Sequence, residues 1–149
     1  MNKCSNFKIK RQVQLHETDL GALMHHHNYF LWMEQAEYEM FRHIDEKVVG
    51  DLDENFKGSG WPRSKVEMKY LKPLRFEDEV EIHLKICRIR NAAIEYEADF
   101  WRISEGEKEL VSVGKYQAVS CLYSSIQFSD PEIVPAPQEF LDKLEVFRE

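Results

Sequence analysis

Two different spacings of apolar residues divide the chain into strand and helix. Between residues 7 and 15, apolar side chains occupy alternate positions, with lysine and glutamine between them, a pattern typical of a half-buried strand. From Asn28 onward the spacing changes to three and four, as Trp32, Ala36 and Met40 show. This period predicts a helix of roughly four to five turns. Asn28 is predicted to be its N-cap, because asparagine side chains accept hydrogen bonds from the first helical N–H groups.

Four more alternating segments follow, and short connections containing Pro, Asp, Asn or Gly separate them. They lie at residues 66–70, 80–86, 94–100 and 111–119. Strands joined by short turns usually pair with their neighbours in antiparallel order. Together with the first strand they predict a five-stranded antiparallel sheet.

The remaining segments are less regular. Residues 45–60 are rich in Asp, Glu, Gly and Asn and are predicted to form a loop with room for a short helical turn. Residues 124–137 are interrupted by proline, whereas residues 138–149 place apolar side chains on one face of a short helix. No repeat or second domain is apparent, so we expect residues 1–149 to form one domain.

The order of these elements predicts an α+β protein. A helix with this many apolar residues cannot stay exposed, so we expect the sheet to curl around it and bury Trp32, Met33, Ala36 and Met40. Such a sheet still has free edges and an outer face. Association of identical chains usually covers them, so a homo-oligomer, either a dimer or a tetramer, is expected.

Composition narrows the possible functions. The 149 residues carry a net charge of −7, so the chain lacks the positive field with which nucleic-acid-binding proteins neutralise phosphates. It has no apolar run typical of a signal peptide or a membrane span. Its three cysteines lack disulfide-framework or zinc-site spacing, and Cys87 and Cys121 are predicted to pack in the core. We therefore expect a cytoplasmic protein that binds neither nucleic acid nor membrane.

Polar groups are concentrated between residues 15 and 33, in the segment LHETDLGALMHHHNYFLWM. Asp19 precedes a turn-forming glycine, and histidines 25–27 with Asn28 precede the predicted helix. An aspartate in the order Thr-Asp-x-Gly often only caps a turn. Adjacent histidines point in different directions and no second ligand cluster has matching spacing, so we expect no metal site.

Two segments resemble the hotdog-fold acyl-CoA thioesterases of the 4-hydroxybenzoyl-CoA thioesterase family. These are H-E-T-D-L-G-A-L-M-H-H-H-N-Y-F-L-W-M-E-Q-A and W-P-R-S-K-V-E-M-K-Y-L-K-P-L-R-F-E-D-E-V-E-I. The resemblance covers residues 7–123 and implies a hotdog fold, in which a five-stranded antiparallel sheet wraps around a long central helix. There are departures from the family pattern: Ala22 stands where a glycine is expected, and His25 stands where tyrosine is common.

The resemblance also implies roles for individual residues. Asp19 matches the catalytic carboxylate, His26 the active-site histidine, and Tyr29 the aromatic residue at the helix start. Thioester hydrolysis needs a carboxylate that attacks or activates water, together with donors for the oxyanion. Backbone N–H groups near His26 and His27 can be these donors, helped by the helix dipole. We expect His25 and His27 to contact substrate, although each can also be an ordinary loop residue.

Coenzyme A carries phosphates, so an acidic protein that binds it must concentrate positive charge locally. The candidates are Arg63 and Lys65 at the start of the second strand and Arg88 and Arg90 at the turn between the third and fourth. Each alone can equally be a solvated edge residue. Related enzymes place coenzyme contacts near this region, which favours Arg88 and Arg90. No cofactor is expected, because CoA is part of the substrate.

These observations predict an enzyme that hydrolyses an acyl-CoA thioester to free acid and CoA, with Asp19 as nucleophile or general base. One alternative is a thioesterase that acts on acyl groups of acyl carrier protein or on an aromatic CoA ester. Another is a noncatalytic acyl-CoA-binding module, since one fold can serve both uses. Glu34 on the predicted helix is either a second acid or a solvent-facing residue. A hotdog dehydratase fits less well, because it would need an acid on the helix acting with a histidine.

Overall fold

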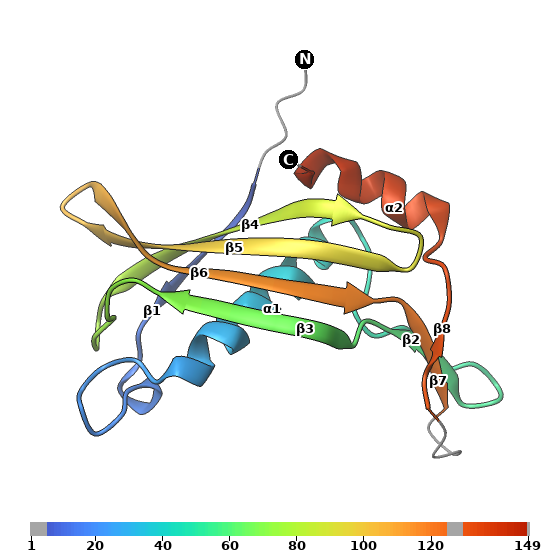
Figure 1. Ribbon diagram of the computed structural model, residues 1–149, viewed down its shortest axis with the longest axis horizontal. Coiled ribbons are helices and arrows are strands. Elements are labelled where there is room, and N and C mark those ends of the chain that lie inside the picture. The colour runs from blue at the N-terminus through green and yellow to red at the C-terminus, as the bar shows by residue number, and fades with distance from the viewer. Residues whose placement is uncertain (1–5, 125–129, 149) are drawn as a thin grey trace.

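The computed structural model describes residues 6–124 and 130–148, and its main feature is a five-stranded sheet with a helix across one face (Figure 1). The strands are β1 (Phe7–Gln12), β3 (Arg63–Tyr70), β4 (Glu79–Ile89), β5 (Ala93–Ser104) and β6 (Glu107–Val119). Their spatial order is β1-β4-β5-β6-β3, and every neighbouring pair is antiparallel. The predicted five-stranded antiparallel sheet is therefore confirmed, with β1 and β3 at its edges.

The helix, α1 (His26–His43), has 18 residues and begins earlier than the sequence predicted. Its N-cap is His25, whose side chain accepts a hydrogen bond from the N–H of His27. The prediction of Asn28 as N-cap was wrong. Asn28 lies inside the first turn, and its buried side-chain amide donates instead to the carbonyl of Glu17 at 2.7 Å.

The buried face of α1 packs on the inner face of the sheet, as its periodicity predicted. Trp32, Met33, Ala36 and Met40 are at most 2% exposed. They face the alternate residues of β4, β5 and β6 that point inward. Helix and sheet lie close together at Gly114, where an added methyl group would overlap the sulfur of Met33.

A second, three-stranded sheet lies beside one end of the large sheet and was not predicted (Figure 1). It consists of β2 (Lys57–Gly60), β7 (Cys121–Ser124) and β8 (Glu132–Ile133), in the order β2-β7-β8. Part of the predicted loop 45–60 is thus the strand β2, and part of the irregular segment 124–137 is the strand β8, and both pair with β7. Residues 125–129 of that segment lie outside the described residues. The sequence KGSG has no apolar alternation, so periodicity could not identify β2.

The C-terminal segment forms the predicted short helix, α2 (Gln138–Leu144), followed by the single 3₁₀ turn η2 (Glu145–Phe147). Its apolar side chains are buried against the end of α1, where Phe140 meets Phe41 edge to face at 5.2 Å. Among the described residues, no helix combines the length and apolar character needed to cross a membrane.

The two cysteines that were expected in the core differ in burial. Cys121 is buried, as predicted, but Cys87 is exposed. The β4–β5 register shifts between Ile86 and Arg88, and the thiol of Cys87 lies on the outer face of the sheet, 3.8 Å from Glu97. The core prediction for Cys87 was wrong because Val80, Ile82, Leu84 and Ile86 are the buried apolar positions of β4, so that alternation places residue 87 on the opposite face.

We predict that Gly114→Ala lowers the free energy of unfolding by about 1–3 kcal/mol, because the new methyl group overfills the helix–sheet contact. A Cβ at this position would also lie 2.8 Å from Cε of Met68. Gly60→Ala is the matched control, since its Cβ would lie 3.4 Å from the ring of Tyr123. Urea denaturation measures both variants, and equal losses would contradict the prediction.

Candidate active site

Asp19 lies at the start of a tight loop that leads into α1. Its N–H donates to the carbonyl of Leu23 at 2.8 Å, and its Oδ1 accepts from the N–H groups of Gly21 and Leu23 at 2.8 and 3.3 Å. This oxygen therefore does cap a turn, which was the structural role considered from the sequence. The residue is exposed, and within residues 6–124 and 130–148 no protein group bonds to Oδ2. One carboxylate oxygen is fixed while the other remains available.

Ala22 has φ +61°, in the left-handed region. Glycine adopts this conformation without steric strain, and most other residues avoid it. The glycine that the family pattern has at this position is thus explained by the shape of the loop. In this chain the same loop forms with alanine.

The amide N–H of His26 lies at the first position of α1. The neighbouring N–H groups of His25, His27 and Asn28 bond to Glu17 O, His25 Nδ1 and His25 O respectively. For the N–H of His26 the described part of the chain offers no acceptor. A free N–H at the positive end of a helix can stabilise a developing negative charge.

The side chains of histidines 25–27 form one group at this helix end. The ring centroid of His25 lies 4.2 Å from those of both His26 and His27. Desolvation and the two neighbouring imidazoles lower the pKa of His25, and the negative charge of Asp19 opposes this shift. The bridge between Thr18 and Met24, together with the bond from the N–H of His25 to the carbonyl of Glu17, holds the Asp19 loop close to the start of α1. No described group of His, Cys, Asp and Glu has an arrangement that could hold a metal ion.

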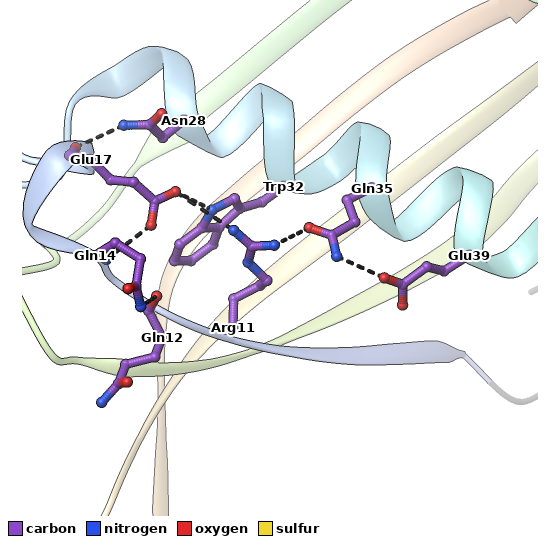
Figure 2. A network of polar contacts seen from close by, with 8 residues as sticks. All are labelled: Arg11, Gln12, Gln14, Glu17, Asn28, Trp32, Gln35 and Glu39. Atoms are coloured by element: carbon purple, nitrogen blue, oxygen red, sulfur yellow. Dashed lines mark hydrogen bonds and ion pairs between the residues drawn. The ribbon is translucent and has the colours of Figure 1, made fainter.

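Glu17 joins the end of β1 to the helix that carries these groups (Figure 2). It is 5% exposed and lies in the 3₁₀ turn η1 (Leu15–Glu17). Its Oε1 accepts from the N–H of Gln14 at 2.9 Å, and its Oε2 accepts from the indole N–H of Trp32 at 2.7 Å. Its carbonyl accepts from the N–H of His25 and from the side chain of Asn28.

Sequence reasoning missed Glu17, although one signal pointed to it. Trp32 was predicted to lie on the buried face of the helix, and a buried indole N–H needs an acceptor. Arg11 adds to the same network: its guanidinium lies 3.8 Å from Oε2 of Glu17 and bonds to Gln35. The network fixes Glu17 in place, and Asp19 follows it by two residues.

Tyr29 lies in the core and is 3% exposed. Its ring packs edge to face against Tyr70 at 5.0 Å and Phe100 at 5.5 Å. Burial raises the pKa of Tyr29 to about 12. The structure therefore places Tyr29 beneath the helix start and apart from the histidine side chains.

The four predicted phosphate-binding cations are not brought to Asp19. Arg63 forms an ion pair with buried Glu37 at 2.9 Å, whereas Lys65 lies on the outer face of the sheet. Arg88 and Arg90 lie at the far end of β4, and Arg90 pairs with Glu95 at 3.1 Å. Gln12, which ends β1 just before the Asp19 loop, pairs with the opposite end of β4.

The length of β4 separates Arg88 and Arg90 from Asp19 by about 30 Å, given the rise of a strand. A cation that lies much closer is Arg75, which sequence reasoning treated only as part of a turn. Its backbone forms a bridge with Leu23 of the Asp19 loop, and its side chain is exposed.

A groove of about 120 Å³ begins one turn beyond His26, between α1 and β3. We call it the α1–β3 groove. It is lined by Phe30, Leu31, Met33, Glu34, Arg63, Val66 and Tyr116. Glu34 is exposed on the surface of the helix and lines this groove.

We predict that Glu17→Ala lowers the free energy of unfolding by about 3 kcal/mol, because it leaves the buried indole N–H of Trp32 without an acceptor. Glu39→Ala is the control, since Glu39 is only half-buried and accepts one bond, from Gln35. That variant should lose less than about 1 kcal/mol. Chemical denaturation followed by circular dichroism compares the two, and a similar loss in both would refute the role of Glu17.

We predict that acid weakens the fold through His25. Its pKa is lower in the folded protein than in the unfolded chain, so its contribution to stability is complete above about pH 6.5 and is lost as the pH falls through the folded value. A protonated ring cannot accept the hydrogen bond from the N–H of His27. His25→Asn keeps a capping side chain that does not titrate. Between about pH 7 and pH 5, urea denaturation should show a smaller loss for this variant than for the wild type, and identical slopes would contradict the prediction.

Comparison with known proteins identifies the family. The sequence profile of the thioesterase-like superfamily matches residues 13–144. A protein of Aquifex aeolicus (strain VF5), provisionally named an esterase, is 26% identical over 150 aligned positions, which cover 93% of this chain and 97% of that protein.

Two solved structures share the fold. The Dynemicin thioesterase superposes with a TM-score of 0.79 at 16% identity, covering 97% of this chain and 98% of the other. A mutant of 4-hydroxybenzoyl CoA thioesterase complexed with 4-hydroxybenzoyl CoA superposes with a TM-score of 0.77 at 13% identity, covering 94% and 99%. These likenesses confirm a hotdog-like fold. Because the profile matches most of its length, the chain belongs to the thioesterase-like superfamily and is a thioester hydrolase.

Proposed function

We propose that this protein hydrolyses an acyl-CoA thioester to the free acid and CoA, using Asp19 and the N–H of His26. The observation that carries the proposal is the arrangement of these two groups at the two ends of one short loop. Among the residues that the structure describes, one carboxylate oxygen of Asp19 has no hydrogen-bond partner, and neither does the N–H of His26 at the helix start. Acyl transfer needs these two functions on opposite sides of a carbonyl.

In the proposed reaction, the N–H of His26 donates to the thioester oxygen, and the dipole of α1 stabilises the negative charge that develops there. Asp19 either attacks the carbonyl carbon directly or removes a proton from an attacking water. In the first route the C–S bond breaks to release CoA, and water then hydrolyses the mixed anhydride to regenerate the carboxylate. In both routes one water is consumed, and the products are one acid and one thiol.

The choice of CoA rests on the family and on substrate chemistry. The related thioesterase complexed with 4-hydroxybenzoyl CoA supports a CoA ester as substrate. Arg75 beside the Asp19 loop is the cation best placed to meet a phosphate of the coenzyme. The α1–β3 groove, which begins close to His26, is the proposed acyl site. A thioesterase for acyl carrier protein would need a further protein-binding surface, and a binding module would retain affinity without releasing thiol.

A homo-oligomer, either a dimer or a tetramer, is part of the proposal, as are a cytoplasmic location and a full hotdog arrangement with α1 as the central helix. Support comes from β3, an edge strand whose Val66 and Tyr70 are 51% and 45% exposed. Arg88 and Arg90 could serve the site of a neighbouring copy, since their own Asp19 is too far away. A monomer in sedimentation experiments at assay concentrations would contradict this part, and recovery outside the cytoplasmic fraction would contradict the location.

We predict that Asp19→Asn lowers kcat for release of CoA thiol by at least about 100-fold, with little change in KM. Asparagine keeps the turn, because its side-chain oxygen can accept the same N–H bonds. Asp53→Asn is a matched control: Oδ1 of Asp53 also caps a turn, accepting from the N–H groups of Asn55 and Lys57 at 2.8 and 2.9 Å.

The assay measures free thiol from a panel of acyl-CoA esters. Wild-type and Asp53→Asn proteins should release thiol at similar rates. If Asp19→Asn is equally active, Asp19 is not catalytic. If the wild type binds CoA esters but releases no thiol from any of them, the protein is a binding module.

A further inference from the structure

The side chains of Glu34 and Arg63 separate the α1–β3 groove from a larger hollow. The larger hollow has a volume of about 480 Å³, and we call it the second hollow. Its apolar lining includes Val48, Val49, Trp61 and Pro62. Glu34 and Arg63 line both spaces. They therefore stand at the boundary between the groove and the second hollow.

Arg63 is held in this position by contacts on several sides. Its Nη2 lies 2.9 Å from Oε1 of Glu37, its Nη1 donates to the carbonyl of Trp61 at 3.0 Å, and its guanidinium stacks on the ring of Tyr116 at 4.4 Å. The side chain of Glu37 is fully buried in α1, and its Oε2 accepts from the hydroxyl of Tyr116 at 2.6 Å. Burial raises the pKa of Glu37, and Arg63 opposes that shift.

Moving Arg63 aside would leave the carboxylate of Glu37 buried without its partner, which is strongly unfavourable. Burial disfavours the charged form of Arg63, but Glu37, Tyr116 and Tyr96 together outweigh this effect, so the pKa of Arg63 is raised. The guanidinium is therefore charged and fixed. An apolar chain that passed it would have to remove its remaining water without replacing those hydrogen bonds.

We infer that Arg63, held by Glu37, closes the far end of the acyl site and sets the length of the acyl group. The inference rests on the proposed function, because it takes the α1–β3 groove as the acyl site. From His26 to Glu34 the helix rises by about 12 Å, which suits an extended chain of medium length such as octanoyl. A palmitoyl chain would have to continue past Arg63 into the second hollow.

The test compares binding of two CoA thioethers that cannot be hydrolysed, S-octyl-CoA and S-hexadecyl-CoA, by titration calorimetry with the whole protein. The wild type should bind the octyl compound more tightly. In the double variant Arg63→Met, Glu37→Gln the barrier is removed and no unpaired buried charge remains. Its affinity for the hexadecyl compound, relative to the octyl compound, should rise at least about tenfold because additional methylenes become buried. An unchanged ratio in a folded double variant overturns the inference.

Val49→Trp reduces the second hollow and provides the control. In the wild-type background it should leave the ratio unchanged, because the chain ends at Arg63. In the double variant it should remove the gain for the hexadecyl compound. If the double variant does not fold, Val49→Trp alone still decides: a changed ratio would mean that chains already enter the second hollow, which overturns the inference.

Binding and hydrolysis are measured separately, so the two proposals can fail separately. If octanoyl-CoA releases no thiol but the thioethers follow the expected pattern, the proposed reaction is wrong and the length limit stands. If thiol is released and the ratio does not respond to the double variant, the reaction stands and the length limit is overturned.

Discussion

The buried carboxylate of Glu17 is the interaction on which the arrangement of the site depends. This carboxylate accepts hydrogen bonds from the N–H of Gln14 and from the indole N–H of Trp32. The backbone carbonyl of Glu17 accepts a hydrogen bond from the N–H of His25. The end of β1, the Asp19 loop and the first turn of α1 are thereby held as one unit. A carboxylate buried with several donors is restricted to one geometry, because each unmet donor would carry a desolvation penalty. The exposed Asp19 can therefore be precisely placed without being buried itself.

Much of the large sheet could be predicted from the sequence, because one buried face imposes alternation on β1, β4, β5 and β6. The same is true of the buried face of α1. The sequence of β3 also alternates, although none of its residues is buried. The second sheet could not be predicted, since its strands are short and β2 is built from Lys, Gly and Ser without apolar alternation. The helix start was misplaced because histidine is not among the usual capping residues, and only the three-dimensional contact between His25 and the N–H of His27 identifies it as the cap.

The candidate site was predictable in part. The density of polar residues between positions 15 and 33 drew attention to Asp19, and the family resemblance suggested its role, which stays a prediction, whereas the start of the helix was placed three residues too late. The roles of Glu17, Glu37 and Arg63 depend on burial and on partners distant along the chain. Acidic residues are rarely buried, so a sequence pattern does not suggest that Glu17 and Glu37 are buried. The predicted cations lie at one end of the sheet, where Arg88 and Lys65 share a row across β4, β5, β6 and β3, and the length of β4 separates this end from Asp19. Whether a cation can bind a ligand depends on its position in the folded protein. The number of charges in the sequence does not determine that position.

The close contact at Gly114 links the packing of the sheet to the shape of the α1–β3 groove. Met33 lies between this glycine and the α1–β3 groove, and its thioether side chain is flexible and adapts to irregular spaces. A larger side chain at position 114 would push the side chain of Met33 toward the groove, although residue 114 itself does not line the groove. Natural variation at this position could therefore change the shape of the groove, the proposed acyl site, while every residue that lines it keeps its identity.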